Sequence, residues 1–577
     1  MGKLLRFLKG YEKESILGPL FKLLEATLEL FVPLAVASLI DVGIGNKDMN
    51  YVIKMFVFLI VLGIVGLAFS LTAQFFAAKA AVGFVKKIRH SLFKHMEQLS
   101  YTEIDMLGTS AMVNRMTSDM NQVQSGMNMS LRLLLRSPFV VAGAFIMAWI
   151  IDGQAAKVFG ITILGLTIIV YGIMLITIPL YRRVQQKLDG VLSATRENLV
   201  GVRVIRAFGL EEKEKKEFSK KHSELTKGQK FVGSISALMN PMTYVVINIG
   251  VAVLIWNGAI QVEYGILTQG AVVALYNYMA QILEELVKLA NMIVLLTKMV
   301  ASGNRIQNVL DMESSQEFPK ETAWESRKEM PYIVFENVAL KYAGAGEESL
   351  SNLNFEVKKG QVVGVIGGTG SGKTSLVNML PRFYDTSHGT VYVDGIDVKQ
   401  YKKEDIRAKV GVVPQKAVLF KGTIRDNLRW GKADADENEI WQALKIAQAE
   451  EIVQGKDDKL DFMIAQNGRN LSGGQKQRLT IARALVRKPE ILILDDSSSA
   501  LDYATDAKLR KALQEMESKP TIFIVSQRTI SIQHADLILV LDDGEMAGMG
   551  THEELLKSCE IYQEIYASQF KKEVQNS

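Results

Sequence analysis

The chain has 577 residues, a length that exceeds one hydrophobic core, so roughly two to four domains are expected. Its 67 basic and 62 acidic residues leave a net charge of only +5, which gives no electrostatic reason to expect a nucleic-acid partner. The single cysteine, Cys559, excludes an internal disulfide and a cysteine metal cluster. Apolar residues make up 48% of the chain, and their excess lies before about residue 300.

Six stretches in this first part are long and apolar enough to cross a bilayer as helices, since a crossing needs about 20 mostly apolar residues. The first contains the charges Lys22, Glu25 and Glu29, and the second and fourth contain none. The basic N-terminus lacks a small-residue cleavage site, so we expect the first stretch to be a span and not a removable signal peptide. The predicted spans are about 16–40, 55–76, 133–151, 158–180, 236–260 and 268–300.

The connections between these spans differ in basic residues. Three are short and hold few Lys and Arg, whereas those after the second and fourth spans are long and basic. Because basic connections stay in the cytoplasm, both termini are predicted to be cytoplasmic. The long connections lack proline and repeat apolar residues at helical spacing, as in Phe84, Ile88 and Leu92, so they are predicted to be helices that extend out of the membrane.

The composition becomes polar and mixed in charge from Asp311 to Glu329. This change predicts a linker at 306–331, between a transmembrane domain at 1–305 and a second domain at 332–570. In the second domain short β-rich runs alternate with helical patterns, which is typical of an α/β fold with a mainly parallel sheet.

A glycine-rich run, Gly367–Thr374, follows the apolar run 362–366 and precedes a helical pattern. Its glycines let backbone N–H groups surround an anion, and the helix dipole favours a phosphate. Lys373 is expected to reach the β- and γ-phosphates, and the Thr374 hydroxyl to hold Mg²⁺. The predicted nucleoside triphosphate site comprises Gly367, Gly368, Thr369, Gly370, Ser371, Gly372, Lys373 and Thr374.

Two further features follow in the same domain. A buried-strand pattern, Ile491–Asp495, ends in the carboxylate of Asp495, which is expected to hold Mg²⁺ through water. Between this strand and the phosphate loop, Asn470–Arg478 forms a second glycine turn before a helical pattern. Such a turn could present a second phosphate surface or be an ordinary capped helix start.

With six preceding spans, the phosphate loop and Asp495, the run LSGGQ makes the chain similar to an ABC exporter half-transporter over nearly its whole length. The resemblance implies a six-helix transmembrane domain with long cytoplasmic helical extensions, followed by an α/β phosphate-loop ABC nucleotide-binding domain, in a bacterial cell membrane. It also implies a dimer in which each ATP lies between the phosphate loop of one chain and the signature run of the other. The signature residues are Leu471, Ser472, Gly473, Gly474 and Gln475.

Other positions match the family pattern singly. By this resemblance Tyr342 would stack on adenine, Ser375 would touch the α-phosphate, and Gln415 would meet Mg²⁺. Asp502 would lie in the loop that crosses between the two ATP sites. The resemblance further implies that the membrane domain docks on the nucleotide domains through two stretches, Tyr101–Asp119 and Glu197–Phe208.

The sequence departs from the family at two catalytic positions. Asp496 stands where the family usually has Glu, and its carboxylate lies about 1–1.5 Å back, a misplacement that can cost roughly 10²-fold in rate. Gln527 stands where the family usually has His, and it cannot carry a positive charge. We therefore hypothesise that this chain binds ATP and hydrolyses it poorly, as the degenerate-site subunit of a bacterial heterodimeric multidrug exporter.

The substrate is indicated by fewer residues. Ionisable groups within membrane spans are functional candidates, and acidic ones could attract lipophilic cations. The expected function is ATP-driven export of small amphiphilic compounds, with a second half-transporter chain and the lipid bilayer as partners and no nucleic acid. Export of lipid or peptide, and an ATP-binding regulatory membrane subunit without transport, remain alternatives. The candidate substrate residues are Glu25, Glu29, Glu284 and Glu285.

Overall fold

The computed structural model describes residues 1–323 and 329–570. Residues 324–328, which fall in the predicted linker 306–331, lie outside the described residues. The first residues of that predicted linker are helical, because helix α11 (Gln269–Leu310) continues through them. Ile306 and Val309 are buried, so this last turn of α11 packs against its own unit and the polar composition begins only after it.

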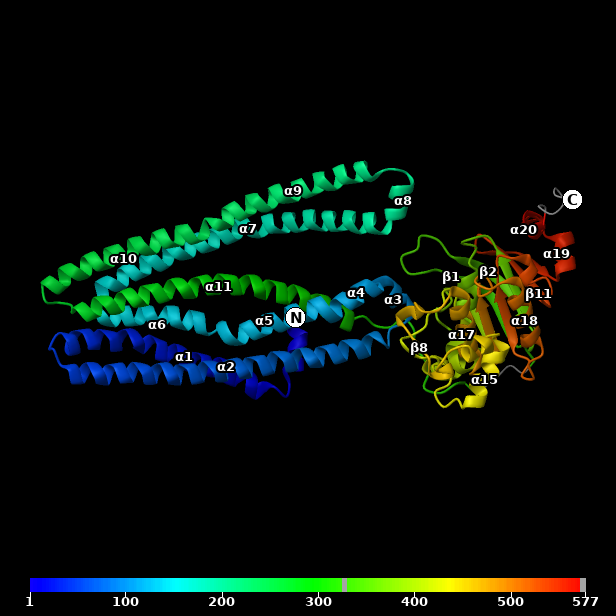
Figure 1. The fold of residues 1–577 in the computed structure, drawn as a ribbon, viewed down its shortest axis with the longest axis horizontal. Helices are drawn as coiled ribbons and strands as arrows, with labels where there is room; N and C mark the ends of the chain where they lie inside the picture. Colours follow the sequence, from blue (N-terminus) through cyan, green and yellow to red (C-terminus); the bar gives the residue numbers. More distant parts are fainter. Residues whose placement is uncertain (324–328, 571–577) are drawn as a thin grey trace. The chain divides into compact units, whose positions relative to one another are not determined.

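The chain divides into two compact units (Figure 1). The helical unit comprises Met1–Glu97 and Thr109–Met312. The second unit contains all the strands of the described residues, and it comprises Gln98–Gly108 and the chain from Glu313 onward. A short helix, α3 (Tyr101–Leu107), therefore belongs to the strand-containing unit although it follows a membrane helix in the sequence.

Among the described residues, six helical stretches are long and apolar enough to cross a membrane, which confirms the predicted six-helix fold class. Several of these stretches contain a short π-helical or irregular turn, so one stretch can comprise two or more of the labelled helices. The bounds in this unit are η1 (Gly2–Leu8), α1 (Glu12–Ser38), η2 (Leu39–Ile44), α2 (Met49–Met96), α4 (Thr109–Asn114), η3 (Arg115–Asp119), α5 (Met120–Leu133), α6 (Arg136–Ile151), α7 (Gly153–Val200), α8 (Val202–Ala207), α9 (Glu211–Ala237), α10 (Met239–Glu263) and α11.

The longest helices extend well beyond a bilayer. Helices α2 and α7 have 48 residues each. At 1.5 Å per residue each is about 72 Å long, whereas the hydrocarbon core of a membrane is about 30 Å thick. These lengths confirm the predicted helical extensions.

The outward face of α2 is apolar in the part predicted to cross the membrane. Phe56, Ile64 and Leu71 are each about 60% exposed. So many exposed large apolar side chains suit a lipid environment, because contact with lipid removes the unfavourable contact of this surface with water. Small residues cover the inward face instead, and Ala73, Ala77 and the neighbouring alanines are buried where α2 runs beside α1.

Polar caps explain where the helices begin after the short links. The carboxylate of Asp48 accepts hydrogen bonds from the first backbone N–H groups of α2, and Asp152 does the same for α7. Thr268 caps α11 through its hydroxyl. These side chains satisfy N–H groups that a helix leaves without partners at its start. The short links therefore reverse the chain without exposing unpaired backbone.

The strand-containing unit has a six-stranded sheet in the order β12-β11-β3-β10-β9-β6, a four-stranded sheet in the order β2-β1-β4-β5 and a small pair β7-β8. In the larger sheet only β12 is antiparallel to its neighbour, so the predicted mainly parallel core is confirmed. The strands are β1 (Ile333–Leu340), β2 (Leu350–Val357), β3 (Val362–Gly367), β4 (His388–Val393), β5 (Ile396–Asp397), β6 (Val410–Val413), β7 (Gly422–Thr423), β8 (Met463–Ile464), β9 (Ile491–Asp495), β10 (Thr521–Val525), β11 (Leu537–Asp542) and β12 (Glu545–Gly550).

Strand β9 shows why the central strands have no polar face. Ile491 and Ile493 pack into one hydrophobic cluster, and Leu492 and Leu494 pack into another on the opposite face. Alternate side chains of a strand point to opposite faces, so a strand covered on both sides must be apolar at every position. The helices of this unit are α12 (Lys373–Met379), α13 (Lys403–Lys409), α14 (Ile424–Arg429), α15 (Glu437–Ile446), α16 (Glu450–Gln454), α17 (Gly473–Leu485), α18 (Tyr503–Gln514), α19 (His552–Ser558) and α20 (Glu560–Phe570), with short turns η4 (Val398–Gln400), η5 (Lys459–Asp461), η6 (Gln466–Gly468) and η7 (Thr529–Ser531).

Candidate functional site

The carboxyl ends of four parallel strands, β3, β6, β9 and β10, meet at one edge of the six-stranded sheet. In open α/β sheets this edge is where ligands bind. A cavity of about 330 Å³ opens there, and we refer to it as the sheet-edge cavity. It is lined by Tyr342, Ser349, Thr369, Gly370, Gly372, Lys373, Thr374, Ser375, Gln415, Asp495, Asp496, Val525, Ser526 and Gln527.

The glycine-rich loop after β3 has a backbone conformation that residues other than glycine adopt only with strain. Gly370 and Gly372 have φ angles of +88° and +89°. A Cβ atom on Gly372 would lie 2.4 Å from the Leu350 side chain, and one on Gly367 would lie 2.1 Å from the Leu541 carbonyl oxygen. The glycines therefore allow both the turn and the close packing of the loop on its neighbours.

Lys373 begins helix α12 directly after this loop. Its Nζ donates hydrogen bonds to the carbonyl oxygens of Gly367 and Gly368, at 3.0 and 2.6 Å. Burial lowers the pKa of Lys373, and the nearby carboxylates of Asp496 and Asp495 oppose that shift. The ammonium group thus lies over the loop, where it could bind an anion held by the backbone N–H groups.

Thr374 and Asp495 contact each other across the cavity. The Thr374 hydroxyl donates to the two carboxylate oxygens of Asp495 at 3.0 and 3.1 Å. Asp495 is buried, and burial raises its pKa while the bond from Thr374 opposes the shift. Gln415 lines the same cavity. Hydroxyl, carboxylate and amide oxygens are the donors that Mg²⁺ prefers, so these three residues fit the predicted metal.

The two residues that depart from the family pattern both line the sheet-edge cavity. Asp496 has a φ angle of +45°, its backbone N–H donates to the Val525 carbonyl at 2.9 Å, and its carboxylate accepts from Gln415 Nε2 at 3.2 Å. Gln527 follows β10, and its carbonyl oxygen accepts from Gln569 at 2.8 Å. The structure therefore brings both departures next to the phosphate loop.

Tyr342 reaches the cavity from the four-stranded sheet side of the unit. Its hydroxyl forms a hydrogen bond with the Ser375 hydroxyl at 2.8 Å, so two predicted nucleotide contacts touch each other. Burial raises the pKa of Tyr342. Its ring meets the ring of Tyr384 edge-on, with centroids 4.9 Å apart and planes at 88°.

Tyr384 was missed by the sequence analysis. Its hydroxyl donates to Asp105 Oδ2 on α3 at 2.6 Å, and the neighbouring Phe383 ring stacks on Tyr101 at 4.6 Å. Burial and the Asp105 carboxylate raise the pKa of Tyr384. A continuous set of contacts thus joins α3 to Tyr342 within this unit. An aromatic pair shortly after the phosphate-loop helix was the available signal, but nothing in it indicates the partner.

The signature run forms a capped helix start. The hydroxyl of Ser472 accepts from the Gln475 backbone N–H at 3.3 Å, and the Gln475 side chain accepts from the Ser472 backbone N–H at 3.1 Å. Leu471 is buried, and a Cβ on Gly474 would lie 3.2 Å from the Ala500 carbonyl. Within the described residues, this run does not line the sheet-edge cavity.

Asp502 also caps a helix. Its carboxylate accepts from the Thr505 backbone N–H and hydroxyl, both at 2.9 Å, at the start of α18. The backbone and side-chain hydrogen bonds from Thr505 lower the pKa of Asp502. Gly474 of the signature run lies close to Ala500, which precedes Asp502, and among the described residues neither the signature run nor Asp502 lines the sheet-edge cavity.

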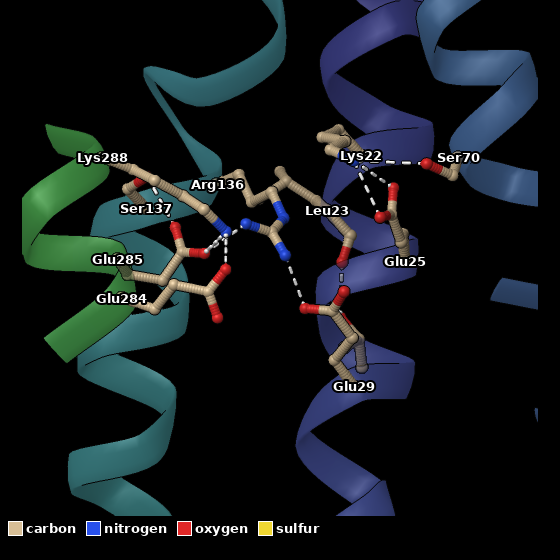
Figure 2. A network of polar contacts seen from close by, with 11 residues as sticks. Lys22, Leu23, Glu25, Glu29, Ser70, Arg136, Ser137, Glu284, Glu285 and Lys288 are labelled. Carbon is tan, nitrogen blue, oxygen red and sulfur yellow. Dashed lines mark hydrogen bonds and ion pairs between the residues drawn. The ribbon is translucent and has the colours of Figure 1, made fainter. Parts of the chain in front are cut away.

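The four predicted substrate residues are paired with cations (Figure 2). Glu25 pairs with Lys22 on the same helix at 2.6 Å. The others belong to a set joining α1, α6 and α11 that we name the charge cluster. Its members are Glu29, Arg136, Glu284, Glu285 and Lys288.

Arg136 is the centre of the charge cluster and was not identified from the sequence. One guanidinium nitrogen bonds Glu29 at 2.6 Å, and the other bonds Glu285. Ser137 donates to the second oxygen of Glu285 at 2.7 Å. The available signal was an arginine inside the third predicted span, where a charge requires a partner.

Comparisons with known proteins agree with this arrangement. The family model described as "ABC transporter transmembrane region" matches residues 15–286, and the model described as "ABC transporter" matches residues 350–499. A Bacillus subtilis protein named "Uncharacterized ABC transporter ATP-binding protein YfiB" is 35% identical over 573 residues, which cover 99% of each chain.

Two further comparisons extend the similarity. "Probable multidrug resistance ABC transporter ATP-binding/permease protein YheI" of Bacillus subtilis is 31% identical, and the match covers 84% of this chain and 83% of that protein. The solved structure of a bacterial Atm1-family ABC exporter with ATP bound has a TM-score of 0.80 and 23% identity. It covers 97% of this chain and 98% of that chain, and it establishes the similarity of the fold.

Proposed function

The chain belongs to the ABC transporter family, as a multi-pass exporter half whose ATP-binding domain drives transport, and from this premise we propose that it exports small amphiphilic compounds as one half of a heterodimer. The name of the multidrug-resistance relative supports this substrate class. The helical unit would be the membrane domain, near 1–305, and the strand-containing unit the nucleotide-binding domain, near 332–570. Both termini and the nucleotide-binding domain would lie in the cytoplasm of a bacterial cell, because the basic connections are on that side.

In this proposal the sheet-edge cavity holds ATP. The backbone N–H groups of Gly367–Thr374 and the ammonium of Lys373 would bind the β- and γ-phosphates, and Ser375 the α-phosphate. Tyr342 would stack on the adenine ring. Thr374, Gln415 and Asp495 would hold Mg²⁺, which would neutralise charge on the bound phosphates.

One observation carries the proposal of a degenerate site: Asp496 and Gln527 line the same cavity as the intact phosphate loop. The Asp496 carboxylate is hydrogen-bonded to Gln415 and is one methylene shorter than the usual Glu, so it would hold the attacking water poorly. Gln527 is neutral and cannot offset charge on the γ-phosphate. The expected loss is about 3 kcal/mol of transition-state stabilisation for a rate deficit of roughly 10²-fold.

The signature run would serve a different ATP. Ser472, Gly473 and Gln475 start a helix whose dipole favours a phosphate, and among the described residues they do not line this chain's own sheet-edge cavity. Their natural ligand would be the ATP bound by the partner chain. That partner is expected to have Glu and His at the positions of Asp496 and Gln527.

The test compares ATPase rates of the purified full-length chain and of the two-chain complex. We expect slow hydrolysis by the chain alone and rapid hydrolysis by the complex. In the two-chain complex, the double substitution Asp496→Glu with Gln527→His should let this chain's own site hydrolyse ATP as well, which adds a second hydrolysis event to each cycle. Lys373→Met in the same background is the matched control, because it removes phosphate binding and should abolish the gain. Rapid hydrolysis by the unsubstituted chain alone would refute the degenerate-site proposal.

Transport is tested separately with the complex in lipid vesicles. ATP-dependent uptake of a fluorescent amphiphile by inside-out vesicles is the expected result. Uptake of labelled lipid or peptide in its place would favour the alternative substrate classes. ATP binding without movement of any of these compounds would favour a regulatory subunit.

A further inference from the structure

Figure 2 shows the charge cluster, whose members come from α1, α6 and α11. Glu29, Arg136 and Glu285 are each 15 or 16 residues from the end of the helical stretch that adjoins a short link. At 1.5 Å per residue these three residues are about 22–24 Å from those ends, which is less than the thickness of a hydrocarbon core of about 30 Å. Charged side chains at this depth face the interior of a helical assembly or a water-filled space, because exposure to lipid is costly.

The buried part of the cluster is balanced. Arg136 and Glu285 are 6% and 3% exposed, and they form an ion pair that Ser137 supports. Removing either partner would leave the other with one remaining ion-pair contact, Glu285 with Lys288 at 3.1 Å or Arg136 with Glu29 at 2.6 Å. Arg136 also keeps its Nε without a hydrogen-bond partner among the described residues. This pair therefore fixes the positions of the other members and has no net charge to offer a ligand.

The exposed part of the cluster carries an excess of negative charge. The side chains of Glu29, Glu284 and Lys288 are 42%, 69% and 36% exposed. Two cations and three carboxylates give the whole cluster a net charge of −1. Among the described residues, Glu29 bonds Arg136 through only one of its oxygens, and Glu284 bonds Lys288 through one. Each exposed carboxylate therefore retains an oxygen that can accept from a ligand.

The same face of α11 is polar for several turns, which is an independent indication that water reaches it. Asn277, Gln281, Glu284, Lys288 and Asn291 recur at spacings of four and three residues, and all are half-buried or exposed. Such spacing places them on one side of a helix. The outward face of α2, by contrast, is entirely apolar from Phe56 to Leu71 at its exposed positions.

The chemistry of this face favours a cation with an apolar body. On the same helix, beside the polar stripe, Tyr276 and Val294 are exposed by 46% and 38%. A carboxylate in a partly dry site attracts a positive charge more strongly than in bulk water. Apolar surface next to it can contact the rest of an amphiphile.

We propose that Glu29 and Glu284 form a subsite in the transport path for the cationic head of an amphiphile, an amine or quaternary ammonium group. Arg136 and Lys288 are positioning residues that hold these two carboxylates apart and oriented. The subsite rests on the proposed export function and adds the charge class of the substrate to it.

The test measures binding and transport on the same full-length complex. Binding of ethidium, a permanently cationic dye, is followed by fluorescence anisotropy in lipid nanodiscs without ATP. ATP-driven uptake of ethidium and of an uncharged dye is followed in vesicles. The variants are Glu29→Gln with Glu284→Gln, and the matched control is Glu263→Gln, an exposed acid at the end of α10.

We expect the double variant to weaken ethidium binding by at least about tenfold, the effect of one lost charge contact of typical strength. Uptake of the uncharged dye should change less than uptake of ethidium, and Glu263→Gln should bind and transport ethidium like the wild type. Glu29→Asp with Glu284→Asp, which keeps both charges, should bind ethidium better than the Gln variant, and this result separates charge from misfolding.

Equal ethidium binding by the wild type and the double variant overturns the subsite. Dissociation of the two chains in the double variant on gel filtration also overturns it, because the carboxylates would then bind basic groups of the partner chain. Failure of the export proposal is distinct, since it is the absence of ATP-driven uptake of any amphiphile, whatever the dye-binding result.

Discussion

The sheet-edge cavity and the charge cluster both gather charged side chains, but they are assembled in different ways. Most residues of the cavity stand in short runs that follow the parallel strands β3, β6, β9 and β10, and Tyr342 and Ser349 join them from the four-stranded sheet side. The charge cluster collects residues from three helices, and α6 supplies Arg136 as its one charge to the cluster. Backbone geometry determines where the side chains of the sheet-edge cavity lie, whereas ion pairing away from water determines where those of the charge cluster lie. Charge substitutions in the cavity should therefore alter ligand binding, whereas substitutions of the buried pair Arg136 and Glu285 in the cluster should alter stability.

The largest expected effect is on stability, from Arg136→Ala. The substitution leaves buried Glu285 with only its 3.1 Å contact to Lys288 and removes the cation of Glu29, so we expect a cost of about 3 kcal/mol of unfolding free energy, the lower end of the range for breaking a buried pair. The measurement is unfolding of the full-length chain in mixed detergent micelles. Arg136→Met with Glu285→Met should recover most of the loss, because it removes both charges. Lys298→Ala, an exposed residue of α11, is the control and should change stability little. If Arg136→Ala and Lys298→Ala lose similar amounts of unfolding free energy, the ion pairs of Arg136 contribute no more to stability than an exposed lysine does.

The next effect is on binding, from Lys373→Met. Loss of the ammonium should weaken binding of a fluorescent ATP analogue about 10–100-fold, the range for one charged hydrogen-bonding group. Its unfolding free energy should change little, because the hydrogen bonds of Lys373 among the described residues go to its own loop, to the carbonyl oxygens of Gly367 and Gly368 and to the Ser371 hydroxyl. A large loss of unfolding free energy with unchanged binding of the ATP analogue would contradict this prediction, because Lys373 would then have the stabilising role expected of the charge cluster.

A smaller effect is expected where α3 meets the cavity. Tyr384→Phe removes the hydroxyl that donates to Asp105, and Asp105→Ala removes the acceptor. In a double-mutant cycle, these two substitutions should show an interaction energy of about 1 kcal/mol. The cycle is measured twice, once on the affinity for an ATP analogue and once on the free energy of unfolding. Tyr503→Phe, at an exposed tyrosine, is the matched control. Additive effects of the two substitutions would mean that the contact does not couple α3 to Tyr342.

The smallest effect concerns an ion pair outside the membrane. Burial raises the pKa of Glu490, but hydrogen bonds from Lys409 and Lys359 outweigh it and lower the pKa to about 2. Because the folded pKa is depressed, this stabilisation is present above pH 4.5 and is lost as the pH falls toward 2. The side chain is 38% exposed, so solvent screening reduces the contribution to roughly 1 kcal/mol.

Glu490→Gln tests this contribution through thermal unfolding of the full-length chain between pH 6 and pH 3. The wild type should lose more stability than the variant over this range. Parallel curves for the two proteins would show that the pair contributes nothing measurable. The comparison with Arg136→Ala then measures how strongly burial changes the value of an ion pair.

The sequence predicted the fold class because the relevant signals are local. A span of about 20 apolar residues and a helix that extends from it are properties of one segment. Strand β9 was predicted from its uninterrupted apolar run, and the structure shows why, since its two faces enter two different hydrophobic clusters. The boundary after α11 was placed a few residues early, because the last buried turn of that helix has no compositional signal against the linker.

Lys373, Thr374 and Asp495 were predicted from the sequence because they follow apolar strand patterns, whereas Tyr342, Ser375 and Gln415 were predicted only from the family resemblance. Once β3, β6, β9 and β10 are parallel neighbours, the residues after them must meet at one edge. The pairing of Tyr342 with Ser375 and the approach of Asp496 to Gln415 then follow from positions already singled out. The nucleotide roles of these residues stay predictions until ligand binding is measured.

The sequence by itself indicated six segments long and apolar enough to cross a membrane and a glycine-rich phosphate loop, and it predicted that Asp496 and Gln527 depart from the family pattern. Only the tertiary structure decided that Arg136 joins Glu29 to Glu285 and that Tyr384 joins Asp105 to Tyr342. The reason is physical. Local backbone rules act over a few residues, whereas a buried charge or a ring takes its partner from whichever helix the packing brings within reach.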